Sequence, residues 1–369
     1  MINPCFAGWR LRGRGRVSAL LLAMSVLVTG CDGETPIMIG AVLPLSGPGV
    51  SVGQDIRDGL DLAIERVNDR GGVNGRPLVL SVQDGAGGPQ AAWDAILAGD
   101  QEPLLTVAGT SSVAVALKPL AEDRERILFG LVATAPALTE GAEWVFRYWL
   151  TAEQELPIMT SVLPDDVGGV AVYYLDDAYG QSVYGNVREV FTGTEVVVTG
   201  VPFAPADTAF GAVVEAGQGA DVAVVVGFAS HIRGVLAALK DSGFPGVIVS
   251  TTAAALPEVV SDPVSDDVLV AAPAIFNLSF RFADDVKRLY ESLHGRPFNQ
   301  YVANGYDFII MLAGLLDGTP ADRDALREQL RKGFVYSGVF GNVTLPAGAH
   351  DIAFPLFPAR IRDGEIVYR

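Results

Sequence analysis

The chain has 369 residues, half of them hydrophobic, and a formal net charge of −17 at pH 7. A surface this acidic repels nucleic acid and anionic lipid headgroups, so we expect no nucleic-acid partner. The length is sufficient for two domains, each with its own core.

The first segment combines a basic head with a short apolar run. Four arginines lie within the first 16 residues and precede an apolar stretch over 17–29. That stretch is too short to span a bilayer, which requires about 20 apolar residues. A basic head, a short apolar stretch and an exit of small residues predict an export signal over residues 1–30.

A cysteine follows this apolar run directly. Val28-Thr29-Gly30-Cys31 resembles a bacterial lipobox, in which cleavage before the cysteine exposes it for acylation. We therefore expect a lipidated Cys31, a short linker over 31–36 and an exported protein, periplasmic or at the cell surface, anchored to the membrane by its acyl chains. An ordinary signal peptide that ends near a cysteine is the alternative. Cys5 would leave with the signal, so the folded body would have no disulfide and no cysteine metal site.

Beyond this segment, apolar runs of strand length alternate with stretches of helical period. Strands are predicted at 37–45, 77–84, 103–109, 127–133, 169–175, 194–203, 220–228, 246–252 and 268–275, with short strand-like pieces at 340–345 and 364–368. Helices are predicted at 52–70, 89–98, 112–123, 180–192, 230–242, 280–294, 301–317 and 322–332. Most of the strands are apolar on both faces, which is typical of parallel strands covered by helices on both sides. The alternation predicts an α/β fold with mostly parallel sheets.

The strand–helix series runs twice, which indicates two lobes. Four units run to about residue 150, and a second series runs from 168 to about 262. Ligands of open α/β sheets bind beyond the carboxyl ends of the strands. Two lobes that face each other across those ends would form a cleft.

No catalytic set stands out in the sequence. The three histidines, His231, His294 and His350, belong to no HExxH pattern, and no GxSxG occurs. The turn DGAGGP at 84–89 lacks the third glycine of a dinucleotide-binding loop. We therefore expect a protein that is not an enzyme and uses neither a metal nor a cofactor.

Two strand-to-helix turns are rich in hydroxyl groups, namely VAGTSSVAVALKPL at 107–120 and GLVATAPALT at 130–139. Ser111 or Ser112 can cap the first helix, and Thr134 precedes Pro136, which favours a first helical turn. Free backbone N–H groups at both helix starts, together with the hydroxyls, would bind a carboxylate or a similar oxygen-rich group. Plain N-capping is the alternative.

With these turns the chain resembles the periplasmic leucine/isoleucine/valine-binding proteins, the type I solute receptors of ABC transporters. The resemblance covers nearly all of 37–369 and is carried by IGAVLPLSGPG, GGVNGRPLVLSVQD, VAGTSSVAVALKPLAE, ATAPALT, YYLDDAYGQSVYGNVREVF, ADVAVVVGFASHIRGVLAALKDSGF, QYVANGYDFIIMLAGLL and FVYSGVFGNVTL. It implies two α/β lobes joined by three crossovers. Lobe 1 would comprise 36–150 and 275–343, and lobe 2 would comprise 151–274 and 344–369.

The resemblance also implies a ligand site between the lobes. Carried over by position, the expected ligand-binding residues are Ser111, Val132, Ala133 and Thr134 for a carboxylate of the ligand, Val52 for its side chain and Tyr179 from the second lobe.

The sequence departs from the family on the second lobe. The family's amino-acid receptors place an aromatic residue after a strand ending in glycine, which is Phe228 here, and an acid 24 residues later. That acid position falls at Thr252, which cannot supply the negative charge that a ligand ammonium requires. Either Asp176, Asp177 or another acid substitutes, or the ligand is not a free α-amino acid.

The resemblance implies a lipid-anchored solute-binding component of an ABC importer that closes its lobes on a small polar solute. Its partners would be an ABC permease and a ligand, either a branched-chain amino acid or a related amide, urea-like compound or carboxylate. A ligand-sensing or regulatory envelope lipoprotein with the same fold is the alternative.

Overall fold

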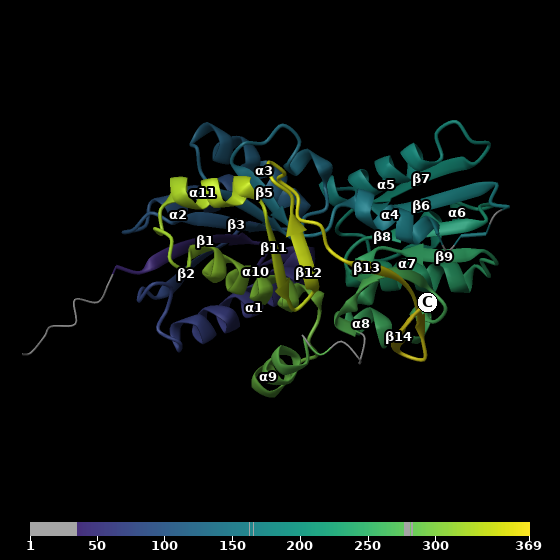
Figure 1. Ribbon diagram of the computed structural model, residues 1–369. Helices are drawn as coiled ribbons and strands as arrows, with labels where there is room; N and C mark the ends of the chain where they lie inside the picture. The colour runs from purple at the N-terminus through teal and green to yellow at the C-terminus, as the bar shows by residue number, and fades with distance from the viewer. Residues whose placement is uncertain (1–34, 162, 165, 277–280, 282) are drawn as a thin grey trace, which may run out of the picture. The chain divides into compact units, whose positions relative to one another are not determined.

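The computed structural model describes residues 35–161, 163–164, 166–276, 281 and 283–369. The predicted signal at 1–30 and the predicted lipidation site Cys31 lie outside these residues. Two open sheets carry the fold (Figure 1): a five-stranded sheet of order β2-β1-β3-β4-β5 and a seven-stranded sheet of order β14-β13-β10-β9-β8-β6-β7.

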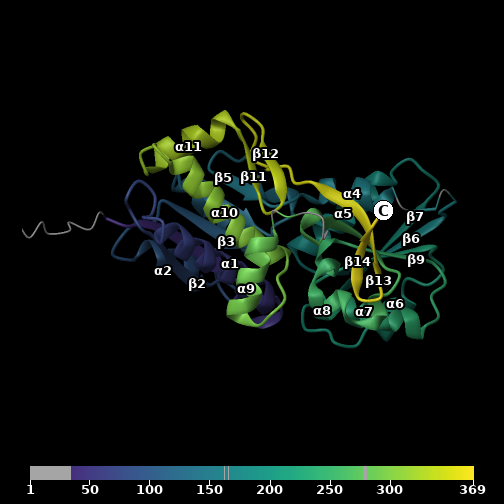
Figure 2. The ribbon, with the colours of Figure 1, turned by 60° about the horizontal axis from the view of Figure 1, so that its bottom comes forward.

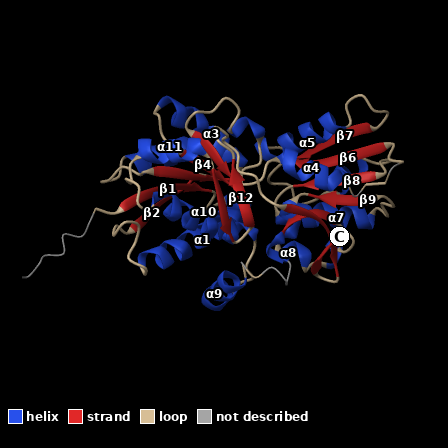
Figure 3. Ribbon diagram, viewed as in Figure 1, coloured by secondary structure: helices blue, strands red, loops and turns tan. Residues whose placement is uncertain are grey.

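The first sheet is parallel throughout and is covered by helices on both faces (Figure 3). Its strands are β1 (Ile37–Leu43), β2 (Leu78–Asp84), β3 (Leu105–Gly109), β4 (Leu128–Leu131) and β5 (Val145–Tyr148). Its main helices are α1 (Val50–Asn68), α2 (Pro89–Leu97), α3 (Ser111–Asp123) and α10 (Gln300–Leu316). Alternate strand residues pack into different cores: Val107 lies in the core that includes α1 and α10, and its neighbour Ala108 in the core that includes α2 and α3. This burial of both faces explains the continuous apolar strands.

The second sheet repeats this arrangement and adds an antiparallel edge. Its parallel strands are β6 (Gly169–Leu175), β7 (Val197–Phe203), β8 (Val222–Val226), β9 (Val247–Ser250) and β10 (Leu269–Pro273), and its antiparallel strands are β13 (Leu356–Arg362) and β14 (Glu365–Tyr368). Its helices are α4 (Ala152–Thr160), α5 (Ala178–Val190), α6 (Gly211–Glu215), α7 (Ala229–Asp241) and α8 (Pro257–Val260). Val172 lies in a core with α4 and α5, and the next residue, Tyr173, in a core with α7.

The remaining elements lie between β10 and β13 in the chain. They are α9 (Asp284–His294), α11 (Arg323–Lys332) and the antiparallel pair β11 (Phe334–Gly338) and β12 (Gly341–Leu345). The chain passes between the two sheets three times, from β5 to α4, from β10 towards α10, and from β12 to β13. The lobe bounds given above remain predictions.

The predicted α/β class with parallel sheets is confirmed, and the predicted strands and helices are all present, with ends shifted by a few residues. The strands β5, β11 and β13 and the helices α4, α6 and α8 were not predicted. Strand β5 has only four residues, and α4 contains Pro157 and two acids in its first turn, which obscure a helical apolar period. Strands β11 and β13 each include exposed positions and so lack the continuous apolar run of a central strand.

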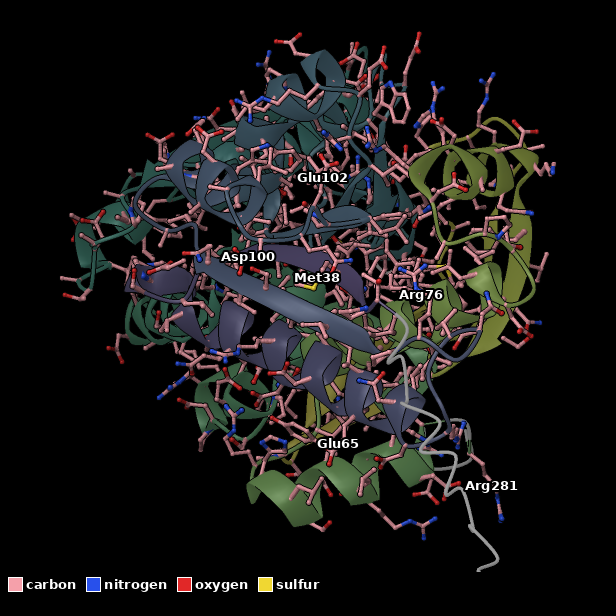
Figure 4. All side chains as sticks on the ribbon, turned by 90° about the vertical axis from the view of Figure 1, so that its left-hand side faces the viewer. Met38, Glu65, Arg76, Asp100, Glu102 and Arg281 are labelled. Atoms are coloured by element: carbon pink, nitrogen blue, oxygen red, sulfur yellow. The ribbon has the colours of Figure 1, made fainter. Side chains whose placement is uncertain are left out.

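Polar contacts hold the chain where it enters β1. The Arg76 guanidinium lies beside this entry (Figure 4) and donates to the carbonyl oxygens of Thr35 at 2.7 Å and Pro36 at 3.3 Å. The Gln101 amide donates to the Pro36 carbonyl at 2.7 Å. Within the described ranges, no helix has both the length and the apolarity needed to cross a bilayer.

Helices α1 and α10 lie side by side against the first sheet (Figure 2), and glycines at their contact allow the close approach. A Cβ on Gly59 would lie 2.1 Å from the Val302 carbonyl oxygen, and one on Gly305 would lie 2.3 Å from the Ile56 carbonyl oxygen. Neither helix backbone can yield without moving the other, so this contact fixes the spacing of the pair.

We predict that Gly59→Ala lowers the free energy of unfolding by about 1–3 kcal/mol, because the added methyl group forces the two helix backbones apart. Gly314→Ala is the matched control, since Gly314 lies on the exposed side of α10 with open space around it. That control should be neutral or stabilising by about 0.5–1 kcal/mol. Chemical denaturation of both variants measures the difference, and equal effects would contradict the close packing.

Candidate ligand-binding site

A cavity lies where the carboxyl ends of strands from both sheets meet. Its volume is about 30 Å³, well below the roughly 300–1,000 Å³ of typical small-molecule sites, so the walls must move apart to admit a solute. Its walls come from the residues directly after β3, β4 and β5 of the first sheet and after β6, β8 and β9 of the second, with additions from α1, α4 and α10. This is the location expected for a ligand of open α/β sheets.

Seven of the eight predicted ligand-binding residues line this cavity: Val52, Ser111, Val132, Thr134, Tyr179, Phe228 and Thr252. Ala133 does not. Its side chain is fully buried in the core with α2 and α3, and its carbonyl oxygen accepts a hydrogen bond from Arg147 at 2.6 Å.

The two hydroxyl-rich turns are joined to each other by Ser111. Its Oγ accepts the backbone N–H groups of Thr134 at 3.0 Å and Ala135 at 3.2 Å. The prediction that the amides of the second turn are free is therefore wrong: this turn leads into a short 3-10 helix, Pro136–Leu138, and its amides reach back to Ser111. Both lone pairs of the Ser111 hydroxyl are used, so its proton is the group left to donate to a ligand.

The start of α3 keeps its free amides. Thr110, rather than Ser111 or Ser112, is the N-cap residue, and no side chain caps the helix. The backbone N–H groups of Ser111, Ser112 and Val113 have no acceptor in the part of the chain that the structure describes. Together with the helix dipole, these donors favour an anionic group at this end of the cavity.

Thr134 presents a second hydroxyl without a partner. The side chain is 4% exposed, and its Oγ1 makes no hydrogen bond within the described chain. A buried hydroxyl left unsatisfied costs about 1–3 kcal/mol. A ligand oxygen in the cavity would remove this cost.

Two residues at the cavity wall adopt backbone conformations that their side chains disfavour. Thr110 has φ = 70° and Val132 has φ = 51°, and both side chains branch at Cβ. Positive φ in such residues costs about 1–3 kcal/mol and is concentrated at functional sites. These backbone conformations turn the chain sharply after β3 and after β4, which brings the two hydroxyl-rich turns together.

Arg147 of β5 holds the second turn from below. Its side chain is fully buried and donates to the carbonyl oxygens of Ala133 at 2.6 Å and Ala135 at 2.9 Å. Its Nε pairs with Asp351 at 2.8 Å, in the chain segment between β12 and β13. The turn that carries Thr134 is thus tied to a segment that passes between the sheets.

The cavity also contains an acid that the sequence did not identify, Glu155 of α4. Glu155 lies in the first turn of α4 and is 2% exposed. Its Oε1 accepts the backbone N–H of Thr252 at 2.7 Å and also the Thr252 hydroxyl. Burial raises the pKa of the Glu155 carboxyl to about 7, and the bonds from Thr252 only partly oppose this. A threonine followed by acids, Thr151 to Glu155, is a helix-start signal that could have located it.

The other candidate acids differ in position. Asp177 lines the cavity and caps α5 by accepting the Gly180 N–H at 2.9 Å, whereas Asp176 is exposed and bonds to Gln181 at 2.9 Å. Burial raises the pKa of the Asp177 carboxyl. Asp177 also accepts the hydroxyl of Ser112 at 3.0 Å, which links α3 of the first sheet to α5 of the second.

A second bond links the two sides of the cavity. The Gln300 amide, at the start of α10, donates to the Thr252 carbonyl oxygen at 3.0 Å. Between these polar points the wall is largely apolar and aromatic, with Val52, Val132, Trp149, Phe228, Ala253 and Tyr301. Among the described lining residues none is basic, and two, Glu155 and Asp177, are acidic.

The family profile of periplasmic binding proteins matches residues 36–365, which is most of the chain. The chain belongs to the periplasmic binding protein family. Its resemblance to the leucine/isoleucine/valine-binding branch is confirmed by relatives such as the Leu/Ile/Val-binding protein BraC3 of Rhizobium johnstonii, 24% identical over 325 residues, covering 84% of this chain and 87% of the relative.

Other relatives within the family carry different descriptions. The chemotactic signal transduction system substrate-binding protein BasB of Halobacterium salinarum is 29% identical over 307 residues, covering 78% of this chain and 72% of that protein. A solved structure of the branched-chain amino acid transporter substrate binding protein LivJ of Streptococcus pneumoniae, in complex with isoleucine, shares the fold with a TM-score of 0.77. It is 19% identical, and the match covers 90% of this chain and 97% of that one.

We predict that Thr134→Val keeps or raises the free energy of unfolding, by up to about 1–3 kcal/mol, because it removes a buried hydroxyl that has no partner in the described chain. The same change should weaken ligand binding roughly tenfold, since it removes a donor to the ligand. Thr139→Val is the matched control: the Thr139 hydroxyl bonds to Asp351 at 2.8 Å, so that variant should lose stability. Equal destabilisation of the two variants would show that the Thr134 hydroxyl has a structural partner.

Proposed function

We propose that this protein captures a small polar solute outside the cytoplasm, a branched-chain amino acid or a related amide or carboxylate, and delivers it to an ABC permease. The observation that carries the proposal is the division of the cavity wall. Donors from Ser111, Thr134 and the start of α3 gather on the first sheet, and the rest is mainly apolar. Such a wall suits a compact solute with an oxygen-rich end and an apolar body.

Capture would be coupled to the approach of the two sides of the cavity. The bonds from Ser112 to Asp177 and from Gln300 to Thr252 join residues on opposite sides, so separating the sides breaks both. A solute that contacts both walls binds the joined state more tightly and shifts the population towards it. The permease would recognise that state.

We expect the protein to bind its solute reversibly and without chemical reaction. Isothermal titration against a panel of amino acids, amides, urea and short carboxylates should give one class of ligand that binds with 1:1 stoichiometry. Ser111→Ala should weaken its binding by tenfold or more, because the hydroxyl proton that faces the ligand is lost.

Ser292→Ala is the matched control for this substitution. Ser292 lies on α9, away from the cavity, and its hydroxyl bonds only to the Leu289 carbonyl of its own helix at 2.9 Å. That variant should bind normally. Thermal unfolding of each variant separates loss of binding from loss of fold, and wild-type protein that binds no panel member would count against the proposal.

The predicted export signal and lipidated Cys31 extend the proposal to the membrane. Thr35 follows Cys31 by only four positions, so a lipid on Cys31 would hold the folded body close to the bilayer. We predict that Cys31→Ser releases the protein from the membrane fraction of expressing cells and abolishes labelling by radioactive palmitate. Unchanged membrane association and labelling would contradict the anchor.

Sensing is the second candidate function, because BasB is described as part of a chemotactic signal transduction system. The two candidates differ in what a deletion strain loses. Transport predicts that uptake of the ligand falls, whereas sensing predicts that the behavioural response to the ligand is lost while uptake persists.

A further inference from the structure

Glu155 is an enclosed acid, 2% exposed, and no basic side chain of the described residues pairs with it. Both hydrogen bonds to its carboxylate, from the Thr252 amide and the Thr252 hydroxyl, reach Oε1. Its second oxygen, Oε2, has no hydrogen-bond partner in the described chain, and the residue lines the cavity. A charged carboxylate removed from water is stable only when a cation or several donors compensate it.

None of the described residues that line the cavity supplies such a cation. The groups that face it are Tyr179 on α5, Tyr301 on α10 and Thr252 after β9, and Asp177 is the other acid of the cavity. The pKa values of both tyrosine hydroxyls are raised, mainly by burial, so they stay neutral at physiological pH. Burial raises the pKa of Glu155 to about 7 and thus favours its neutral form when no cation is beside it.

The bonds from Thr252 also determine where this carboxylate lies. The amide and hydroxyl of Thr252 both donate to Oε1 of Glu155, and both residues line the cavity. These bonds hold the carboxylate of α4 at the cavity wall, beside the residues that follow β9. Because two hydrogen bonds hold Oε1 in place, the position of Oε2 is also restricted.

We propose that Glu155 accepts the positively charged amino group of the ligand through Oε2, so that the solute is a free amino acid rather than an amide or a simple carboxylate. This inference rests on the proposed solute-binding function and narrows its ligand class. When Glu155 is protonated in the empty cavity, capture releases that proton to solvent, because only the carboxylate can pair with an ammonium.

The opposite wall fits the other end of such a molecule. Ser111 and Thr134 offer hydroxyl groups, and the start of α3 offers free amides, all from the first sheet. A zwitterion with an apolar side chain would thus meet donors on one sheet and an acceptor on the other. A ligand without the amino group would leave Glu155 buried and unpaired.

Matched ligand pairs test this directly. L-leucine and 4-methylpentanoate differ only in the amino group, as do L-valine and 3-methylbutanoate. Isothermal titration of the wild type should show that the amino acid of a pair binds roughly hundredfold or more tightly than its partner. Glu155→Gln should remove that preference, weakening the amino acid by a similar factor while leaving the des-amino acid nearly unchanged. Asp177→Asn, which keeps an oxygen to cap α5, is the matched acid control and should retain the preference.

The pH dependence gives a readout that a purely structural role would not produce. Between about pH 8 and about pH 6, the affinity for the amino acid should fall by up to tenfold per pH unit below the pKa of Glu155, whereas that for the des-amino acid should not fall in this way. Titrations in buffers of different protonation enthalpy should detect proton release on binding near pH 6, and Glu155→Gln should abolish both effects.

The pH dependence of the melting temperature of the ligand-free protein tests the state of Glu155 independently of binding. A buried acid with a raised pKa favours the folded state when protonated, and that contribution is lost as pH rises from about 4.5 through about 7. Glu155→Gln should therefore raise the melting temperature more at pH 8 than at pH 5, because the amide needs no cation.

The outcomes separate the two levels of the proposal. Wild-type protein that binds no member of either pair or of the wider panel would contradict solute binding, and the amine assignment with it. Preference for a des-amino acid, or an amino-acid affinity that Glu155→Gln leaves unchanged, would overturn the amine assignment alone. Loss of the preference in Asp177→Asn but not in Glu155→Gln would assign the ammonium to Asp177 and overturn the proposal.

Discussion

A charged solute held away from water needs a partner for each of its charges, and in this protein none of the described residues that line the cavity is basic. Negative charge on the solute must therefore be met by hydroxyl protons, free backbone amides and the positive end of the α3 dipole. Positive charge can be met only by Glu155 or Asp177. This constraint connects the features that otherwise look separate: the bonding of Ser111 to the second turn, the partnerless hydroxyl of Thr134, and an enclosed glutamate without a cation.

Several residues of the cavity wall reduce the stability of the ligand-free protein. Thr110 and Val132 hold unfavourable backbone conformations, Thr134 has a hydroxyl without a partner in the described chain, and burial disfavours the charged form of Glu155. Each costs on the order of a few kcal/mol, which is a large part of the net stability of a folded domain. The extensive double-sided cores of the two sheets, together with Arg147 beneath the second turn, compensate for this. A bound solute would recover part of the cost, which is a physical reason for binding to be coupled to the joining of the two walls.

Most of the fold could be predicted from the sequence because its strands are buried on both faces, as in β3, and its helices have clear apolar periods, as in α1. The elements that were not predicted have a weak hydrophobic pattern: β5 is four residues long, and α4 is interrupted by Pro157. Residues that line the cavity could be predicted where they closely follow a strand, as with Ser111, Thr134 and Phe228, whereas their role in binding stays a prediction. Glu155 was not, because it comes from α4, and its relation to Thr252 depends on a contact across 97 positions in the chain. The engagement of the Thr134 amide by Ser111 is likewise a tertiary contact that local capping rules cannot show.

The central claim is that the cavity orients a zwitterion, with its carboxylate towards the first sheet and its ammonium towards α4. A crystal structure of the protein with the amino acid that binds most tightly tests this most directly. The account predicts the ligand nitrogen within hydrogen-bond distance of Glu155 Oε2 and a carboxylate oxygen on the hydroxyls of Ser111 and Thr134. A ligand bound in the reverse orientation, or elsewhere than between these residues, would contradict it.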